Sequence, residues 1–105
     1  HNKAPAKAEA LSRRAVAAAP NDAAYRDTLA EILAARGDLP KALSEQQQAV
    51  RLEPGNPMYL AHAGTLQARL GQKDEAIASL SRALKMSDAF PGAAEARKLL
   101  ESLRR

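Results

Sequence analysis

Few residues in this chain could perform chemistry. His62 is the one histidine inside the sequence and cysteine is absent, so a metal site could add only carboxylates such as those of Asp27 and Glu31. Protein zinc sites usually combine several histidines or cysteines. We therefore expect no metal and no other cofactor. We expect His62 to be solvated or to line a groove, as an unperturbed imidazole commonly does.

Catalytic constellations are also absent from the sequence. A hydrolase or transferase needs a nucleophile with a base, a pair of carboxylates in a cleft, or a glycine loop that holds phosphate, and none is recognisable. His1, followed by Asn2, looks like a cloning remnant, and we assign it no role. We predict that this chain is not an enzyme.

The sequence repeats itself with a period of 34 residues. That step separates Pro20 from Pro54 and Tyr25 from Tyr59. The same step relates small and apolar residues: Ala8, Ala42 and Ala76; Ala15, Ala49 and Ala83; Val16, Val50 and Leu84; Gly37 and Gly71. A period of 34 differs from the ankyrin, armadillo and leucine-rich spacings.

The recurring residues suit hairpins of two helices. Ala42 and Ala76 would let two helix backbones approach closely, where a larger side chain would force them apart. Gly37 and Gly71 would take the left-handed conformation that often follows a helix end. Pro54 cannot continue the helix that it follows. These features predict antiparallel helix hairpins of similar length.

With these residues the chain resembles the tetratricopeptide-repeat (TPR) family over nearly its whole length. The resemblance implies an all-α solenoid of antiparallel hairpins in a right-handed superhelix. We expect one domain, 1–105, with a half repeat, two repeats and a capping helix at residues 3–20, 23–56, 57–90 and 91–105. Six helices are expected near residues 4–19, 22–36, 39–52, 57–70, 73–86 and 91–104.

Some positions depart from the family pattern. Gln46 and Gln67 stand where the family usually has apolar or aromatic residues, and Asp88 replaces the closing proline. Tyr25 and Tyr59 stand one residue before the usual aromatic position. The packing around Gln46 and Gln67 is therefore the part of the fold that the sequence predicts least.

The two ends of the chain differ in pattern. Residues 91–104 carry an apolar stripe opposite charged residues, which is typical of a helix that caps a repeat array. The first helix has the pattern of a second helix in a repeat, so we expect the chain to be the C-terminal part of a longer bacterial array. With no cover for Leu11 and Val16, we expect self-association through this helix.

The charge pattern bears on the class of partner. The net charge is +4, but the excess lies at both ends, and residues 15–90 hold eight basic and nine acidic side chains. A nucleic-acid binder usually gathers basic residues on one face, often with aromatic residues, so we expect no nucleic acid. Apolar runs are far shorter than the roughly 20 residues of a membrane span, so we expect no membrane insertion.

The family resemblance places the partner-binding groove along the first helix of each repeat. It implies ten lining residues: Ala24, Asp27, Thr28, Glu31, Ala35, Met58, Ala61, His62, Thr65 and Arg69. The Lys, Asn and Arg clamp with which some family members grip a terminal carboxylate is absent. Because Asp27 and Glu31 would repel a carboxylate, we expect a protein or peptide ligand with basic or polar groups.

These observations favour a protein-interaction scaffold. Residues 88–103 resemble the ends of bacterial envelope scaffolds linked to exopolysaccharide export, which favours the periplasm, although the lack of cysteine is equally compatible with the cytoplasm. The alternative is a regulatory or assembly segment of an enzyme whose catalytic domain lies elsewhere in a longer chain.

Overall fold

The computed structural model describes the backbone of residues 3–105 and the side chains from Ala6 onward, so His1 and Asn2 lie outside it. This part of the chain forms α-helices and no strand. The helices are α1 (Lys3–Ala18), α2 (Ala23–Ala35), α3 (Leu39–Leu52), α4 (Pro57–Arg69), α5 (Lys73–Met86) and α6 (Ala93–Arg104). The all-α prediction is confirmed, and the bounds of α3 and α5 agree with those expected.

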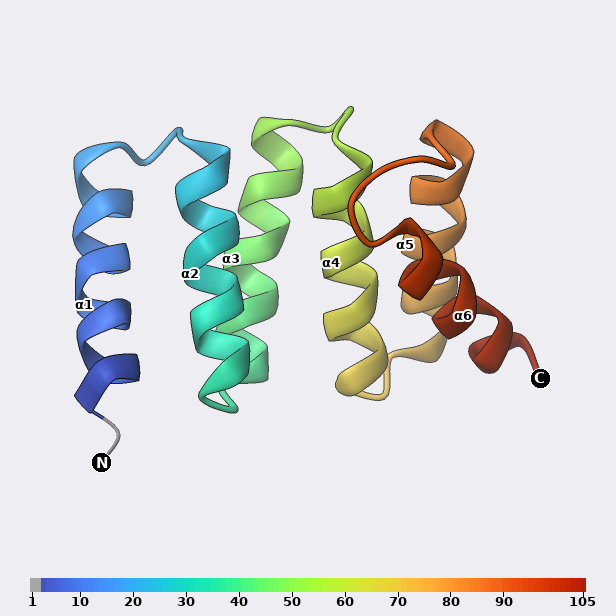
Figure 1. The fold of residues 1–105 in the computed structure, drawn as a ribbon, viewed down its shortest axis with the longest axis horizontal. Coiled ribbons are helices and arrows are strands. Elements are labelled where there is room, and N and C mark those ends of the chain that lie inside the picture. The colour runs from blue at the N-terminus through green and yellow to red at the C-terminus, as the bar shows by residue number, and fades with distance from the viewer. Residues whose placement is uncertain (1–2) are drawn as a thin grey trace.

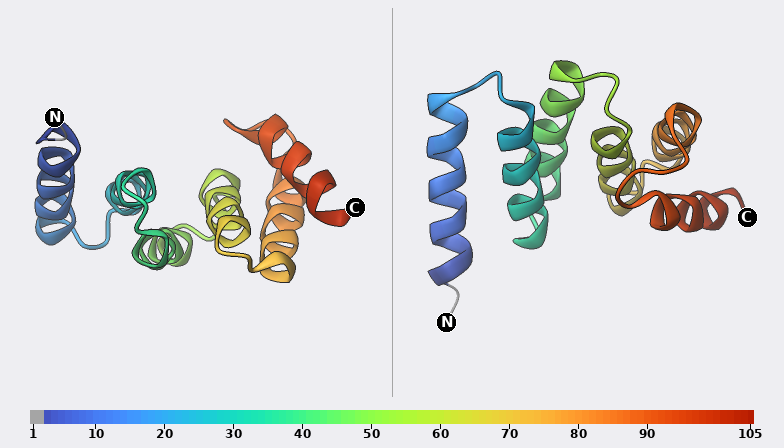
Figure 2. Two further views of the ribbon diagram at one scale, coloured as in Figure 1. Left: turned by 90° about the horizontal axis from the view of Figure 1, so that it is seen from below. Right: turned by 45° about the horizontal axis from the view of Figure 1, so that its top comes forward.

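The helices stand side by side in chain order along a body of 39 × 29 × 20 Å (Figure 1). Helices α2 and α3 form one antiparallel hairpin, α4 and α5 form the next, and α3 packs on α4 to join the two. Helix α1 packs on α2, and α6 lies across α5 and also contacts α4 (Figure 2). This arrangement is a helical solenoid in which each hairpin supports its neighbour.

Side chains and backbone turns mark where the helices begin and end. The side chain of Asp22 accepts a hydrogen bond from the Tyr25 amide, and Asp38 and Asn56 cap α3 and α4 in the same way. Gly37 and Gly71 follow α2 and α4 with φ of 87° and 79°, which confirms their expected left-handed conformation. The hairpin turns are therefore fixed by local chemistry.

Helix α6 begins later than expected. We predicted a start at Pro91, a residue type that suits the first turn of a helix. Instead Gly92 has φ of 91°, and the Ala93 amide donates to the carbonyl of Phe90 at 3.0 Å. This turn redirects the chain, so the helix begins at Ala93.

Small residues allow the helices of a hairpin to approach closely, as predicted. Ala42 and Ala76 are fully buried. A Cβ added to Gly64 of α4 would lie 2.8 Å from Cγ of Leu80 in α5, inside normal contact distance. Leu80 is itself fully buried in a close-packed interior, so moving it aside would be costly. Close packing of α4 on α5 therefore depends on a residue without a side chain.

The two ends of the solenoid are covered to different extents. Ala96 and Leu100 of α6 are buried in the apolar cluster of α4 and α5, as a capping helix requires. In α1, Val16 is buried in the apolar cluster that also contains Leu29 and Leu33, so the expectation that it lacks cover is wrong. The side chain is covered because α1 turns this face toward α2. Leu11 on the same helix is 62% exposed.

Candidate partner-binding groove

A buried carboxylate joins three helices beside the groove. Asp27 of α2 is 8% exposed, and its Oδ1 atom accepts a hydrogen bond from Nε2 of Gln46 in α3 at 2.9 Å. The same amide nitrogen lies 3.1 Å from the main-chain oxygen of Tyr59 in α4. Gln46 is 1% exposed, and these two bonds satisfy its buried amide. They also answer the question that the sequence left open about its packing.

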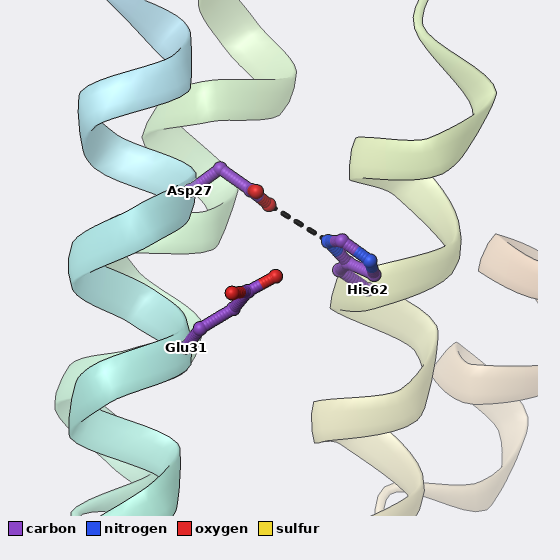
Figure 3. Close-up of side chains that lie close together, drawn as sticks. All are labelled: Asp27, Glu31 and His62. Carbon is purple, nitrogen blue, oxygen red and sulfur yellow. Dashed lines mark hydrogen bonds and ion pairs between the residues drawn. The ribbon is translucent and has the colours of Figure 1, made fainter. Parts of the chain in front are cut away.

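His62 of α4 completes this network. Its Nδ1 atom lies 2.7 Å from Oδ1 of Asp27, and because a carboxylate only accepts, the Nδ1–H of His62 is the donor (Figure 3). The hydrogen bond to Asp27 raises the pKa of His62 above its usual value of 6.5, and the charges of Asp27 and Glu31 add to the rise, while burial opposes it. His62 is therefore a paired, half-buried residue and not simply a solvated one.

Glu31 lies one helical turn beyond Asp27 and points toward the same region (Figure 3). Ligand atoms of Asp27, Glu31 and His62 all lie within 4.8 Å of one another, a spacing that three metal ligands could have. However, Oδ1 of Asp27 already accepts two hydrogen bonds, and a proton occupies Nδ1 of His62. Asp27 and His62 thus link α2 to α4, with the exposed carboxylate of Glu31 beside them.

An open pocket of about 310 Å³ adjoins this link, between α2 and α4. Its floor is largely apolar, with Ala30, Ala34 and Leu66. Two exposed charges of opposite sign, Glu31 and Arg69, also line it. In the described part of the chain neither has an ion-pair partner. The pocket can thus accept an apolar side chain with polar or charged groups beside it.

The structure brings half of the predicted groove residues into this pocket: Glu31, Ala35, His62, Thr65 and Arg69. Asp27 lies beside the pocket, where it holds His62. Ala24 and Thr28 are exposed on α2 outside the pocket, and Met58 is half-buried against the cluster around Tyr59.

Ala61 does not face the groove, and its prediction as a partner contact is wrong. It is 5% exposed and packs in the cluster with Leu80 and Ala83 of α5. Ala61 precedes His62 by one position, about 100° around the helix, so the two side chains point in different directions. That rotation turns Ala61 into the core while His62 faces α2.

Sequence reasoning missed four residues of the pocket: Ala30, Ala34, Gln46 and Leu66. The two alanines and the leucine recur at the spacing of the buried face of a helix. That spacing predicts core residues, so it gave no reason to place them in the groove. Gln46 comes from α3, the second helix of its hairpin, which the family resemblance does not place in the groove. The one sequence feature that could have indicated its special role is that Gln46 is a polar residue at a position where the pattern is apolar.

No protein-family model matches the chain. The TPR repeat-containing thioredoxin TTL4 of Arabidopsis thaliana is 38% identical over 71 residues, which are 68% of this chain and 10% of that protein. The chain thus spans about a tenth of the curated relative that it matches.

Solved structures share the fold closely. The Yersinia enterocolitica type III secretion chaperone SycD, solved in complex with a peptide of the translocator YopD, has a TM-score of 0.87 at 16% identity, covering 95% of this chain and 79% of that chain. The TPR2B domain of yeast Sti1, solved as a complex with pHsp70, has a TM-score of 0.87 at 19% identity, covering 95% and 82%. The chain belongs to the tetratricopeptide-repeat family. Its 34-residue period and hairpin geometry agree with that assignment.

No helix in the described part of this TPR chain combines the length and the apolar character that a membrane crossing requires.

Proposed function

We propose that this TPR chain is a protein-interaction module, without catalytic activity of its own, that holds a peptide segment of a partner in the pocket between α2 and α4. The observation that carries the proposal is the open pocket of about 310 Å³, with an apolar floor and exposed charges at Glu31 and Arg69. Two structures of the same fold were solved as complexes, SycD with a peptide of YopD and the TPR2B domain of Sti1 with pHsp70.

The charges favour a particular partner chemistry. Asp27 is compensated by His62 and Gln46, so Glu31 provides the exposed negative charge at this part of the groove. A basic residue of the partner would gain from Glu31, and an acidic or polar residue would gain from Arg69. An aliphatic side chain between them would cover Ala34 and Leu66. The favoured ligand is therefore a mixed-charge peptide rather than an acidic tail.

The test uses labelled peptides of basic, acidic and mixed charge around one leucine, with affinity measured by fluorescence anisotropy. We expect Glu31→Lys and Arg69→Glu each to weaken the mixed-charge peptide by at least about fivefold. Glu101→Lys on α6 is the control for the first variant. Arg51→Glu is the control for the second, because Arg51 and Arg69 both lie in the last turn of a helix.

Circular dichroism of each variant establishes that its fold is intact. Equal affinities of the two groove variants and the two controls would move the binding surface away from the α2–α4 pocket. Asp27 stays unchanged in this test, since it supports the packing of three helices.

A second candidate is that this segment assists an enzyme within a longer protein. The relative at 38% identity is a TPR repeat-containing thioredoxin, of which the matching part is only 10%. In this candidate the groove binds a substrate protein or another subunit for a catalytic domain elsewhere in the chain. The sequence of the complete gene tests this candidate, because a catalytic domain in the same chain would support it and the lack of one would contradict it.

The finer parts of the proposal rest on sequence resemblance. We propose the division into a half repeat at 3–20, repeats at 23–56 and 57–90, and a capping segment at 91–105. Residues 88–103 support membership of a bacterial envelope assembly such as an exopolysaccharide exporter. Fractionation of cells that produce the tagged full-length protein tests this assignment, and a cytoplasmic location would contradict it.

A further inference from the structure

A second depression, of about 600 Å³, lies between α5 and α6, well separated in sequence from the groove residues. Three exposed basic residues, Arg82, Lys85 and Arg104, line it. In the described part of the chain none of the three forms an ion pair with a carboxylate. Their charges are therefore available to a ligand.

One of these cations is held in place across the depression. Nη2 of Arg104 in α6 donates a hydrogen bond to Oγ of Ser81 in α5 at 2.9 Å. A guanidinium that is fixed in this way loses less side-chain freedom when it binds a carboxylate than a free one does. The hydrogen bond also links α6 to α5.

The depression also has apolar walls. Ala78 and Leu84 of α5 and Leu100 of α6 line it together with the cations. An aliphatic side chain of a ligand could cover them, while acidic groups on either side pair with the basic residues. Among the lining residues there is no aromatic ring on which a nucleic-acid base would stack.

We propose that this α5–α6 depression binds an acidic peptide segment of a partner protein, with carboxylates at Arg82, Lys85 and Arg104 and an aliphatic side chain between them. The site is distinct from the α2–α4 pocket, which carries one exposed charge of each sign, Glu31 and Arg69, whereas the charged residues that line the α5–α6 depression are all basic. One partner with segments of both kinds would engage the solenoid at two points, which would raise its overall affinity.

The probe for this site is a fluorescein-labelled peptide, Glu-Asp-Leu-Asp-Glu, titrated with the full chain by anisotropy at low salt. We expect Arg82→Glu with Lys85→Glu to weaken its binding by at least about tenfold. Lys73→Glu with Lys98→Glu makes the same change in net charge at exposed cations outside the depression, and we expect at most about a twofold effect. Ala78→Trp fills the hollow without a charge change and should also weaken binding.

Further probes identify the class of ligand. Replacement of the leucine in the peptide by glycine should reduce affinity by about fivefold, because the apolar contact is lost. Absence of peptide binding, or equal losses in the two double variants, would overturn the proposal. Tighter binding of phosphatidylserine vesicles or of an oligothymidine strand through the same cations would also overturn it in favour of that class. The Glu31→Lys variant should bind this acidic probe no more weakly than the unmodified chain, which separates the test from that of the groove.

Discussion

The Nδ1–H of His62 donates to Oδ1 of Asp27 at 2.7 Å and so connects α4 of one hairpin with α2 of the other. The same oxygen accepts from Gln46, which reaches the backbone of α4 as well. In a solenoid, stability comes from hairpins and from the contacts between neighbours. A polar network at this interface therefore supports both the fold and the wall of the pocket.

We expect Asp27→Ala to destabilise the chain by about 1–3 kcal/mol, because it removes the acceptor for His62 and one acceptor for the buried amide of Gln46. The free energy of unfolding is measured by urea denaturation. Glu31→Ala is the control one turn away, on an exposed side chain, and should change stability by less than about 0.5 kcal/mol. Equal effects of the two substitutions would show that the network adds nothing.

The pKa of His62 predicts how stability depends on pH. Its folded value lies above the usual 6.5, so the extra stability from the protonated form of His62 is fully present below pH 6.5 and is lost as pH rises through the folded pKa. The stability difference between the unmodified chain and His62→Gln should thus be larger at about pH 5.5 than at about pH 8.5.

Urea denaturation at the two pH values measures this difference, and an NMR titration of the His62 ring measures the pKa directly. In an Asp27→Asn background the pKa should fall, because the hydrogen bond to a charged carboxylate is its largest cause. A stability difference that is the same at both pH values would contradict the prediction.

Gly64 and Gly55 form a matched pair for testing the close approach of α4 and α5. A Cβ at Gly64 would meet Cγ of Leu80 at 2.8 Å, whereas a Cβ at Gly55 would meet no atom within 4 Å. We expect Gly64→Ala to destabilise by about 1–3 kcal/mol through overpacking. Gly55→Ala should stay within about 0.5 kcal/mol of the unmodified chain. Thermal melts compare the two, and similar midpoints would show that α5 shifts to accept a methyl group.

The sequence predicted the hairpins because their ends carry local signals. Gly37 and Gly71 provide the left-handed residues that follow α2 and α4, as their place in the repeat indicated. The helix near residues 91–104 was predicted, but α6 begins at Ala93 rather than at Pro91, because Gly92 adopts a left-handed turn. Pro91 favours a helix start and Gly92 favours a left-handed turn, and the chain adopts the turn.

The candidate site was less predictable because it depends on contacts between distant residues. Glu31 and Arg69 follow from the face of their helices, and both line the pocket. The partners of Gln46 lie 19 and 13 positions away, on helices whose relative rotation no local pattern determines. Ala61 was placed in the groove for the same reason. Successive residues of a helix point about 100° apart, so Ala61 faces the core although its neighbour His62 faces the groove.

The last prediction concerns α1, which packs on α2 and leaves Leu11 62% exposed. Burial of a leucine contributes roughly 1.5–3 kcal/mol, so contact between the Leu11 side chains of two copies would favour a weak dimer. We propose that the isolated chain self-associates through this face at high micromolar concentration. Leu11→Glu should give monomers by sedimentation, without loss of helicity. Val16 is unsuitable for this test because it is buried in the apolar cluster that also contains Leu29 and Leu33. If the unmodified chain sediments as a monomer at all concentrations, the exposed face of α1 does not drive association.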